Sequence, residues 1–221
     1  MKSTLIVFSL NEIEAANEMF ERFPFEEVDE YFVIDGGSTD GTVDFFRQKG
    51  IPVIQQNIPG HGEAYKVGML NATGDILVFI GCDGNGRPEE ILKLIKEIKK
   101  GNDLVIASRF GKDSKSYDAT PVRRFGNWIF AFMINIWNQT KLTDVFNELR
   151  AIRKDCMQNM NLQSSYFELE LEMISKALKS NLKVVEIPTI EEERIGGTAK
   201  LSTIKDGLIN LRCFVKYQLL Q

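Results

Sequence analysis

The first half of the chain alternates short apolar runs with segments of helical spacing, and no other feature limits the fold as strongly. The apolar runs lie at 4–9, 31–35, 51–55, 75–81 and 103–108. The helical patterns between them lie near 12–22, 41–49, 62–72 and 88–99. Strands that are buried on both faces and joined by helices form a mostly parallel sheet of βαβ units. We therefore expect an α/β fold that binds ligands at the carboxyl ends of its strands.

The second half of the chain is richer in helical patterns. Residues 121–140 predict one long helix with aromatic side chains over most of its surface, and 167–181 predict an amphipathic helix. A strand is expected at 183–189, followed by a final amphipathic helix after residue 201. No segment has the composition of a linker or a repeat, and 221 residues suit one large core. A single domain over 1–221 is predicted.

Charge, cysteine content and hydropathy narrow the class of protein. The net charge of −4 gives no general attraction to nucleic acid. Cys82, Cys156 and Cys213 are far apart and form no CxxC pair, which argues against a disulfide framework and fits a reducing cytoplasm. The first apolar stretch is too short for a signal peptide, and no apolar run reaches the roughly 18–20 residues that span a bilayer. We expect a cytoplasmic protein that is soluble or at most peripheral to a membrane.

The segment "VIDGGSTDGT" (33–42) combines a strand end, a glycine-rich turn and a helix start. Asp35 at the strand tip could bind a base or a ribose hydroxyl. A tight βα turn, with Thr39 or Asp40 as helix cap, explains the same residues equally well. The segment is not a Rossmann fingerprint, because GxGxxG is absent and Asp35 precedes the glycines.

The segment "GCDGNGRPEE" (81–90) offers oxygen atoms at the end of another strand. Extended backbone would put Gly81, Asp83 and Asn85 on one side of the chain. Asp83 and Asn85 could hold Mg²⁺, a hard cation that completes its shell with substrate phosphates and water. A plain turn is favoured by local pattern alone, since Pro88 suits the first position of the next helix.

Glycines and cations elsewhere in the chain suggest sites for anions. Gly60 and Gly62 precede a helix that carries Lys66, and backbone amides at a helix start favour phosphate. His61 between them is the only histidine, and a lone loop histidine is more often a bystander than a catalyst. Six further cations could bind an anion, although each could equally be a solvated surface charge: Arg109, Arg123, Arg124, Arg150, Arg194 and Lys200. Arg194 and Lys200 flank Gly196-Gly197, a flexible loop of the type that closes over an anionic substrate.

Taken in order, these segments resemble an inverting family 2 glycosyltransferase of the GT-A fold, most like the dolichol- or polyprenyl-phosphate mannosyl- and glucosyltransferases. The matching motifs run from about residue 4 to 205, and they are "FSLNE" (P-T-x-N-E), "IDGGSTDGT" (D-D-G-S-x-D-G-T), "GHGEAYKVG" (G-x-G-x-A), "FIGCDGNGRPEE" (D-x-D-x-Q/N-x-x-P-E), "ASRF" (G-S-R), "LTDVFNELRAIRKD" (D-x-x-S-G-F-R-x-x-R) and "ERIGGTAKLS" (R-x-x-G-x-S-K-L). The chain departs from them at Gly36 and Gly81, which stand where the motifs have aspartates, and "VFNELR" keeps only the arginine of S-G-F-R.

The resemblance implies a nucleotide-diphosphate sugar bound by residues 1–110 and an acceptor bound by residues 111–221. It implies Mg²⁺ or Mn²⁺ on the diphosphate, held by Asp83 and Asn85. The implied nucleotide-sugar contacts are Glu12, Asp35, Gly37, Ser38, Gly62 and Asp83. The implied contacts to diphosphate and an anionic acceptor are Arg109, Arg123, Arg150, Arg194 and Lys200. The implied catalytic residues are Asp83, Arg109 and Asp144.

Three functions remain open at this point. A polyprenyl phosphate has a second pKa near ~6, so it is largely a dianion at neutral pH and needs cations instead of a base. A glycan or small-molecule hydroxyl needs a base, for which the resemblance implies Asp144. The cations and the aromatic helix favour the lipid phosphate, and that helix could lie at a membrane surface, form a homodimer contact or pack into the core. The third function is nucleotide-sugar or partner binding without catalysis, which the substitutions at Gly36 and Gly81 keep open.

Overall fold

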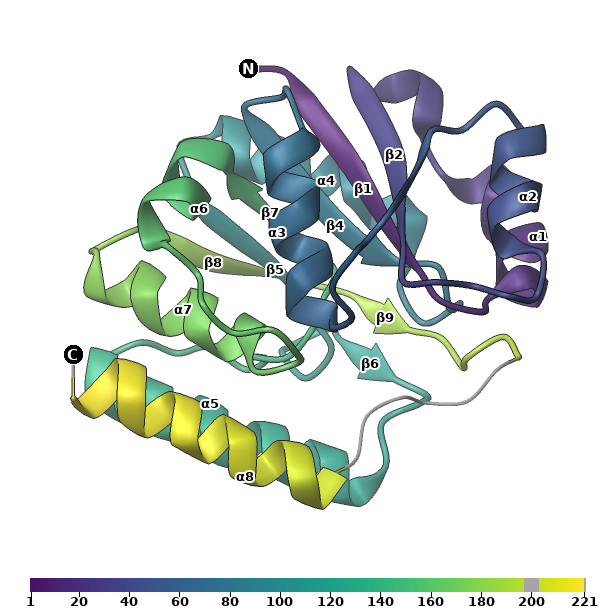
Figure 1. Ribbon diagram of the computed structural model, residues 1–221. Helices are drawn as coiled ribbons and strands as arrows, with labels where there is room; N and C mark the ends of the chain where they lie inside the picture. The colour runs from purple at the N-terminus through teal and green to yellow at the C-terminus, as the bar shows by residue number, and fades with distance from the viewer. Residues whose placement is uncertain (197–202, 221) are drawn as a thin grey trace.

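The computed structural model describes residues 1–196 and 203–220, and its centre is a seven-stranded sheet (Figure 1). The strand order is β3-β2-β1-β4-β7-β5-β8. The strands of this sheet are β1 (Ser3–Ser9), β2 (Glu30–Asp35), β3 (Val53–Gln55), β4 (Ile76–Gly81), β5 (Leu104–Ser108), β7 (Arg150–Arg153) and β8 (Val184–Pro188). A small second sheet pairs β6 (Lys115–Ser116) with β9 (Ile190–Glu191) in parallel. The predicted α/β fold with a mostly parallel sheet is confirmed.

Helices cover both faces of the sheet. One face carries α1 (Ile13–Met19), α2 (Thr42–Gln48) and α4 (Ile91–Lys99), and the other carries α3 (His61–Asn71), α6 (Lys154–Met160) and α7 (Leu169–Lys179). An outer layer of α5 (Pro121–Asn138) and α8 (Thr203–Phe214) lies side by side against α7 (Figure 1). Short 3₁₀ turns occupy Phe20–Arg22, Phe25–Glu27 and Pro88–Glu90, and a π-helical turn at Val215–Leu219 extends α8. None of the helices within these described ranges is long and apolar enough to cross a membrane.

The central strands are apolar throughout because both of their faces are covered. In β1, Leu5 and Val7 pack with α1, α2 and α4, whereas Ile6 and Phe8 pack with α3 and α7. Two cores therefore sandwich the sheet, as the continuous apolar runs of the sequence predict. At the start of α5, Thr120 caps the helix by accepting a hydrogen bond from the amide of Arg123. At the start of α2 the N-cap is Gly41, without a side-chain cap, instead of the expected Thr39 or Asp40.

Strand β7 was not predicted, and it is the main departure from the sequence-based fold. It runs antiparallel between β4 and β5, with Phe79 opposite Arg150 and Leu104 opposite Ile152. Its four residues begin and end with arginine, so no apolar run marks it. This strand brings a segment of the second half of the chain into the middle of the sheet and carries residues 144–149 to the tips of β4 and β5.

Candidate active site

A cleft of about 520 Å³ opens at the carboxyl edge of the sheet. The tips of β1, β4 and β5 form its floor, and the starts of α3 and α5 and the loop before β7 form its walls. This is the edge at which open α/β sheets bind ligands. Four groups of residues surround it: the turn after β2, the turn after β4 that contains Asp83, and two clusters of charged side chains.

The turn after β2 is organised by Asp35. Its carboxylate accepts hydrogen bonds from the amides of Gly37 (2.9 Å) and Ser38 (2.8 Å) and from the hydroxyl groups of Ser38 (2.5 Å) and Ser9 (3.0 Å). Gly37 has a φ of 101°, a left-handed conformation that favours glycine. Asp35 is fully buried and holds the turn together, while the neighbouring Gly36 lines the cleft. Contact of Asp35, Gly37 or Ser38 with a nucleotide stays a prediction.

Asp83 lies just past the tip of β4 and is paired with an arginine from a distant loop. Arg194 donates to Asp83 Oδ2 (2.6 Å) and to Glu12 Oε1 (2.8 Å). Burial alone would lower the pKa of Arg194, but Asp83 and Glu12 raise it overall. The backbone amide of Asn85 donates to Asp83 Oδ1 (3.1 Å), and the side-chain amide of Asn85 donates to the carbonyl oxygen of Glu192 (2.8 Å). Glu12, Asp83, Asn85 and Arg194 are therefore brought together in the cleft.

These residues fit a hard divalent cation that arrives with its ligand. The guanidinium of Arg194 already places one positive charge between the carboxylates of Asp83 and Glu12. Among the described residues, no three His, Cys, Asp or Glu side chains gather closely enough to hold a metal ion by themselves. A Mg²⁺ or Mn²⁺ ion would accordingly take one or two protein oxygens and fill its shell with diphosphate and water.

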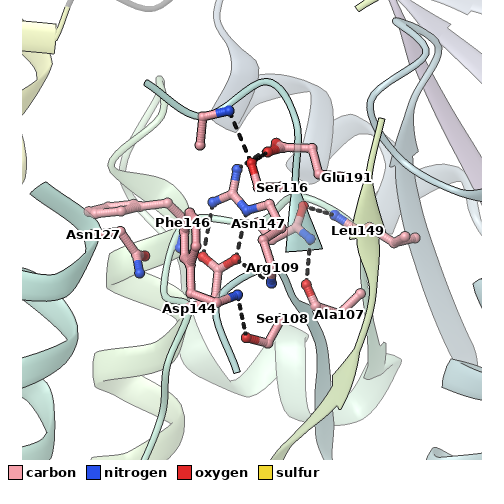
Figure 2. A network of polar contacts seen from close by, with 12 residues as sticks. Ala107, Ser108, Arg109, Ser116, Asn127, Asp144, Phe146, Asn147, Leu149 and Glu191 are labelled. Atoms are coloured by element: carbon pink, nitrogen blue, oxygen red, sulfur yellow. Dashed lines mark hydrogen bonds and ion pairs between the residues drawn. The ribbon is translucent and has the colours of Figure 1, made fainter. Parts of the chain in front are cut away.

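Arg109, Asp144 and Glu191 form a closed set of ion pairs that we call the Arg109 cluster (Figure 2). Arg109 binds Asp144 through Nε (2.6 Å) and Nη2 (2.9 Å) and binds Glu191 through Nη1 (3.0 Å). Burial would lower the pKa of Arg109, yet the two carboxylates raise it well above its usual value. Arg109 lines the cleft, as expected.

Asp144 has a different place from the one expected of a catalytic base. It is fully buried behind Arg109, outside the residues that line the cleft. Its oxygens also accept the amides of Arg109 (3.0 Å) and Phe146 (3.2 Å). A carboxylate held in this way orients Arg109, so this position does not favour a role as base, and the catalytic role of Asp144 stays a prediction.

A second set of charges, which we call the Glu148 cluster (His61, Glu148 and Glu170), was missed by sequence reasoning. His61 Nε2 lies 3.0 Å from Glu170 Oε1 and 3.5 Å from Glu148 Oε2. Burial would lower the pKa of His61, but its hydrogen bond to Glu170 and the nearby carboxylates raise it. All three side chains line the cleft. His61 therefore lies at the cleft, which the sequence did not indicate.

Glu148 is the most perturbed carboxyl of the cleft. Desolvation, followed by repulsion from Asp83, raises its pKa to about 7. The substitution of "NELR" for S-G-F-R was the signal that could have located it, because it introduces an acid into a motif that has none at that place.

The glycines at the start of α3 serve packing. A Cβ atom on Gly62 would lie 2.7 Å from the carbonyl oxygen of Ser164, and one on Gly60 would overlap the carbonyl oxygen of Ser165. The amide of Glu63 donates to that same Ser165 oxygen (3.3 Å). Residues 164–166 thus lie against the helix start, and contact of Gly62 with a nucleotide sugar stays a prediction.

The remaining predicted cations divide into two groups. Arg123 lines the cleft and pairs with Asp118 (3.1 Å). Arg150 is fully buried and donates to the carbonyl oxygens of Asn147 (2.9 Å) and Glu170 (3.4 Å). Its guanidinium therefore holds the loop before β7, and contact of Arg150 with diphosphate or acceptor stays a prediction that this position does not favour. Lys200 lies outside the described residues.

Comparisons with known proteins agree with this geometry. The chain is 28% identical over 199 residues to glycosyltransferase AglJ of Haloferax volcanii, a match that covers 89% of this chain and 65% of that protein. It is 27% identical over 218 residues to the undecaprenyl-phosphate mannosyltransferase of Micrococcus luteus, covering 91% of this chain and 88% of that protein. This chain thus spans just under two thirds of the length of AglJ.

A solved structure shares the fold at low sequence identity. Glucosyl-3-phosphoglycerate synthase from Mycobacterium tuberculosis, in complex with Mn²⁺, UDP and glucosyl-3-phosphoglycerate, aligns with a TM-score of 0.77 and 18% identity. The alignment covers 98% of this chain and 80% of that chain, and it supports the expected GT-A fold. The family model described as Glycosyl transferase family 2 matches residues 4–160, so the chain belongs to glycosyl transferase family 2.

Proposed function

We propose that this chain is a metal-dependent inverting glycosyltransferase that moves a hexose from GDP-mannose or a UDP-sugar to a polyprenyl or dolichyl phosphate. The observation that carries this proposal is one cleft with two kinds of wall. One wall presents Asp83 and Arg109 from the strand tips, Arg123 from the start of α5 and Arg194 from the loop after β9. Elsewhere its lining is aromatic, from Phe110, Phe130, Phe146, Tyr166 and Phe167.

The donor side follows from the charges at the strand tips. Glu12 and Asp83 face the nucleotide end, and Asn85 supplies a further polar group near the diphosphate. When bound, Mg²⁺ or Mn²⁺ neutralises the negative charge that develops on the departing nucleoside diphosphate. The mycobacterial structure that shares this fold holds Mn²⁺ and UDP, which supports the same pairing here.

The acceptor side follows from the paired state of Asp144. A phosphate acceptor needs no base, because with a second pKa near ~6 it is already largely a dianion. One of its oxygens attacks the sugar C1 from the face opposite the diphosphate, the C1–O bond breaks, and its electron pair leaves with the diphosphate. Arg109 and Arg123 hold the acceptor phosphate near this line, and the aromatic wall takes the first isoprene units. The name of the Micrococcus luteus relative supports such an acceptor.

A membrane-bound acceptor also requires the protein to approach a lipid surface. On the outer layer, Phe125, Trp128 and Phe132 are each more than half exposed and stack in sequence along α5. Aromatic side chains of this kind settle at the interface of a bilayer. We include peripheral contact through α5 in the proposal, and a homodimer contact through the same face is its competitor.

A second candidate function is favoured by one observation. Glu148 lines the cleft with its pKa raised to about 7, which suits a base for a glycan or small-molecule hydroxyl. In that function, Glu148 would take the role that the buried Asp144 does not fill.

Turnover assays test these functions directly. The purified chain is supplied with UDP- and GDP-hexoses and Mn²⁺, with either a short-chain polyprenyl phosphate in detergent or a panel of sugar hydroxyl acceptors. We expect glycosyl phosphate lipid as the product, with an anomeric configuration opposite to that of the donor by NMR. Product formed only on hydroxyl acceptors would establish the second candidate. Nucleotide-sugar binding without turnover on any acceptor would point to the non-catalytic function.

A further inference from the structure

Glu148 fills the space in which a side chain at position 81 would lie. A Cβ atom built on Gly81 would overlap Glu148 Oε1 and come within 2.9 Å of its carboxyl carbon. The antiparallel pairing explains this meeting, because Ile76 opposes Arg153 and Phe79 opposes Arg150. Two further residues in the same register place Glu148 across from Gly81. A side chain at position 81 would therefore have to displace the Glu148 carboxylate from the place that it occupies.

The sequence departs from the family motifs at these same two positions. Gly81 stands where D-x-D has its first aspartate, and Glu148 stands where S-G-F-R has its glycine. The chain has therefore lost an acid on β4 and gained one at the facing position before β7. The two departures from the motifs, which read separately as defects, are reciprocal in space.

The surroundings of Glu148 differ from those of a closed ion pair. Glu148, Asp83 and Glu170 all line the same cleft, and the Glu148 side chain is 25% exposed there. His61 Nε2 lies 3.5 Å from Glu148 and is nearer to Glu170, at 3.0 Å. Polar groups that converge in a cleft are characteristic of ligand sites.

We propose that Glu148 restores the missing carboxylate of the D-x-D motif, so that Asp83 and Glu148, from β4 and from the loop before β7, together face the metal–diphosphate group of the donor. This inference rests on the proposed function, since it concerns the donor site of the same reaction. With two protein carboxylates, the remaining oxygens around a divalent cation would come from the diphosphate and water.

The test is binding of Mn²⁺ with UDP and with GDP, measured by calorimetry and by the Mn²⁺ resonance signal, without turnover. Glu148→Gln keeps the shape and removes the charge, and we expect a loss of metal-dependent nucleotide affinity of ~10–100-fold. Glu97→Gln on α4 is the matched control, with a side chain 26% exposed compared with 25% for Glu148, and it should bind as the wild type does.

Variants at positions 81 and 148 separate the effect of the carboxylate charge from the effect of side-chain volume. Gly81→Asp alone should lower the melting temperature, because its side chain meets Glu148. The double variant Gly81→Asp with Glu148→Gly should recover both the melting temperature and Mn²⁺–nucleotide affinity to within about threefold of the wild type. Gly81→Ala with Glu148→Gly should recover only the melting temperature. Such non-additivity is the signature of two residues that share one role.

The outcomes are distinguishable. Wild-type affinity in Glu148→Gln, or equal affinities in the two double variants, would overturn this inference while leaving the proposed function intact. Unchanged binding with lost turnover on hydroxyl acceptors would also overturn it, by making Glu148 a proton acceptor. A wild-type chain that binds neither nucleotide with Mn²⁺ would remove the proposed function and this inference together.

Discussion

The Arg109 cluster and the Glu148 cluster are centred on acids only four residues apart, Asp144 and Glu148, yet their charges are balanced in opposite ways. In the Arg109 cluster, one guanidinium binds two carboxylates through directed hydrogen bonds at 2.6–3.0 Å. In the Glu148 cluster, two carboxylates share one imidazole, and Asp83 adds further repulsion. Each cluster has two carboxylates for one cationic side chain, but the arginine is charged at any ordinary pH and binds both of its partners directly. The imidazole lies closer to Glu170 than to Glu148. The comparison therefore contrasts a tightly paired cluster with a loosely paired one in the same cleft.

The largest expected effect is a loss of stability when the ion pairs of the Arg109 cluster are broken. Asp144→Ala removes the two-pronged partner of Arg109 and leaves a buried guanidinium with Glu191 alone, so the free energy of unfolding should fall by ~3–5 kcal/mol. Denaturant titration measures it. Asp118→Ala, which breaks the more exposed pair with Arg123, should lower it by less than ~1 kcal/mol. Full stability in Asp144→Ala with turnover on hydroxyl acceptors abolished would return Asp144 to a catalytic role.

The next effect concerns Asp83, which belongs to neither cluster but faces the acid-rich one. Asp83→Ala should weaken Mn²⁺-dependent binding of UDP or GDP by at least ~10²-fold, because a direct ligand matters at least as much as an outer-shell partner. Calorimetry with and without Mn²⁺ measures the difference. The Glu97→Gln protein again serves as control. A metal-dependent affinity equal to that of the wild type would refute the metal assignment at the β4 tip.

A smaller effect is the pH dependence of stability in the metal-free protein, which we expect to come from the Glu148 cluster. The pKa of Glu148 is raised to about 7 in the folded state, above its ordinary value of 4.5, so the folded chain holds this proton more tightly than the unfolded chain. Its stabilising contribution is complete below about pH 4.5 and is lost as pH rises through about 7. Wild-type stability should therefore fall across this window by on the order of 2 kcal/mol.

Glu148→Gln isolates that contribution. In this variant the decline between pH 4.5 and 7 should become shallower, with the part due to His61, whose pKa is also raised, remaining. Melting temperatures across this range in chelator provide the measurement. Identical pH profiles for the two proteins would show that the cluster carries no excess of negative charge.

The smallest effect on stability lies outside both clusters. Trp128→Ser on the exposed face of α5 should change the free energy of unfolding by no more than ~0.5 kcal/mol. It should nevertheless reduce co-sedimentation with anionic lipid vesicles several-fold, whereas Leu70→Ser on α3, a site that is even more exposed to solvent, should leave it unchanged. Retained vesicle binding together with loss of a dimer in sedimentation would assign this face to a second copy of the chain.

The sequence predicted what depends on periodicity and on motif order. Apolar runs gave six of the strands of the large sheet, and the ordered motifs led to the family and to Glu12, Asp83, Arg109 and Arg194 in one cleft. It did not reveal β7, because four residues with arginine at both ends have no apolar period. Without β7, nothing indicated that Glu148 meets Gly81 or that Asp144 and Arg150 are fully buried. Such positions depend on which strands pair in the sheet, and the local spacing of apolar residues does not reveal that pairing.

The position of β7 also has a consequence for how the chain is made. Strands β4 and β5 are complete once residue 108 has been synthesised, but the strand that joins them ends at Arg153. At ~5–20 residues per second, a nascent chain carries two open strand edges for several seconds before β7 can enter between them. A fragment that ends near residue 110 would keep those edges permanently. We therefore expect such a fragment to aggregate, which would make the nucleotide-binding half inseparable in practice from the half that follows it.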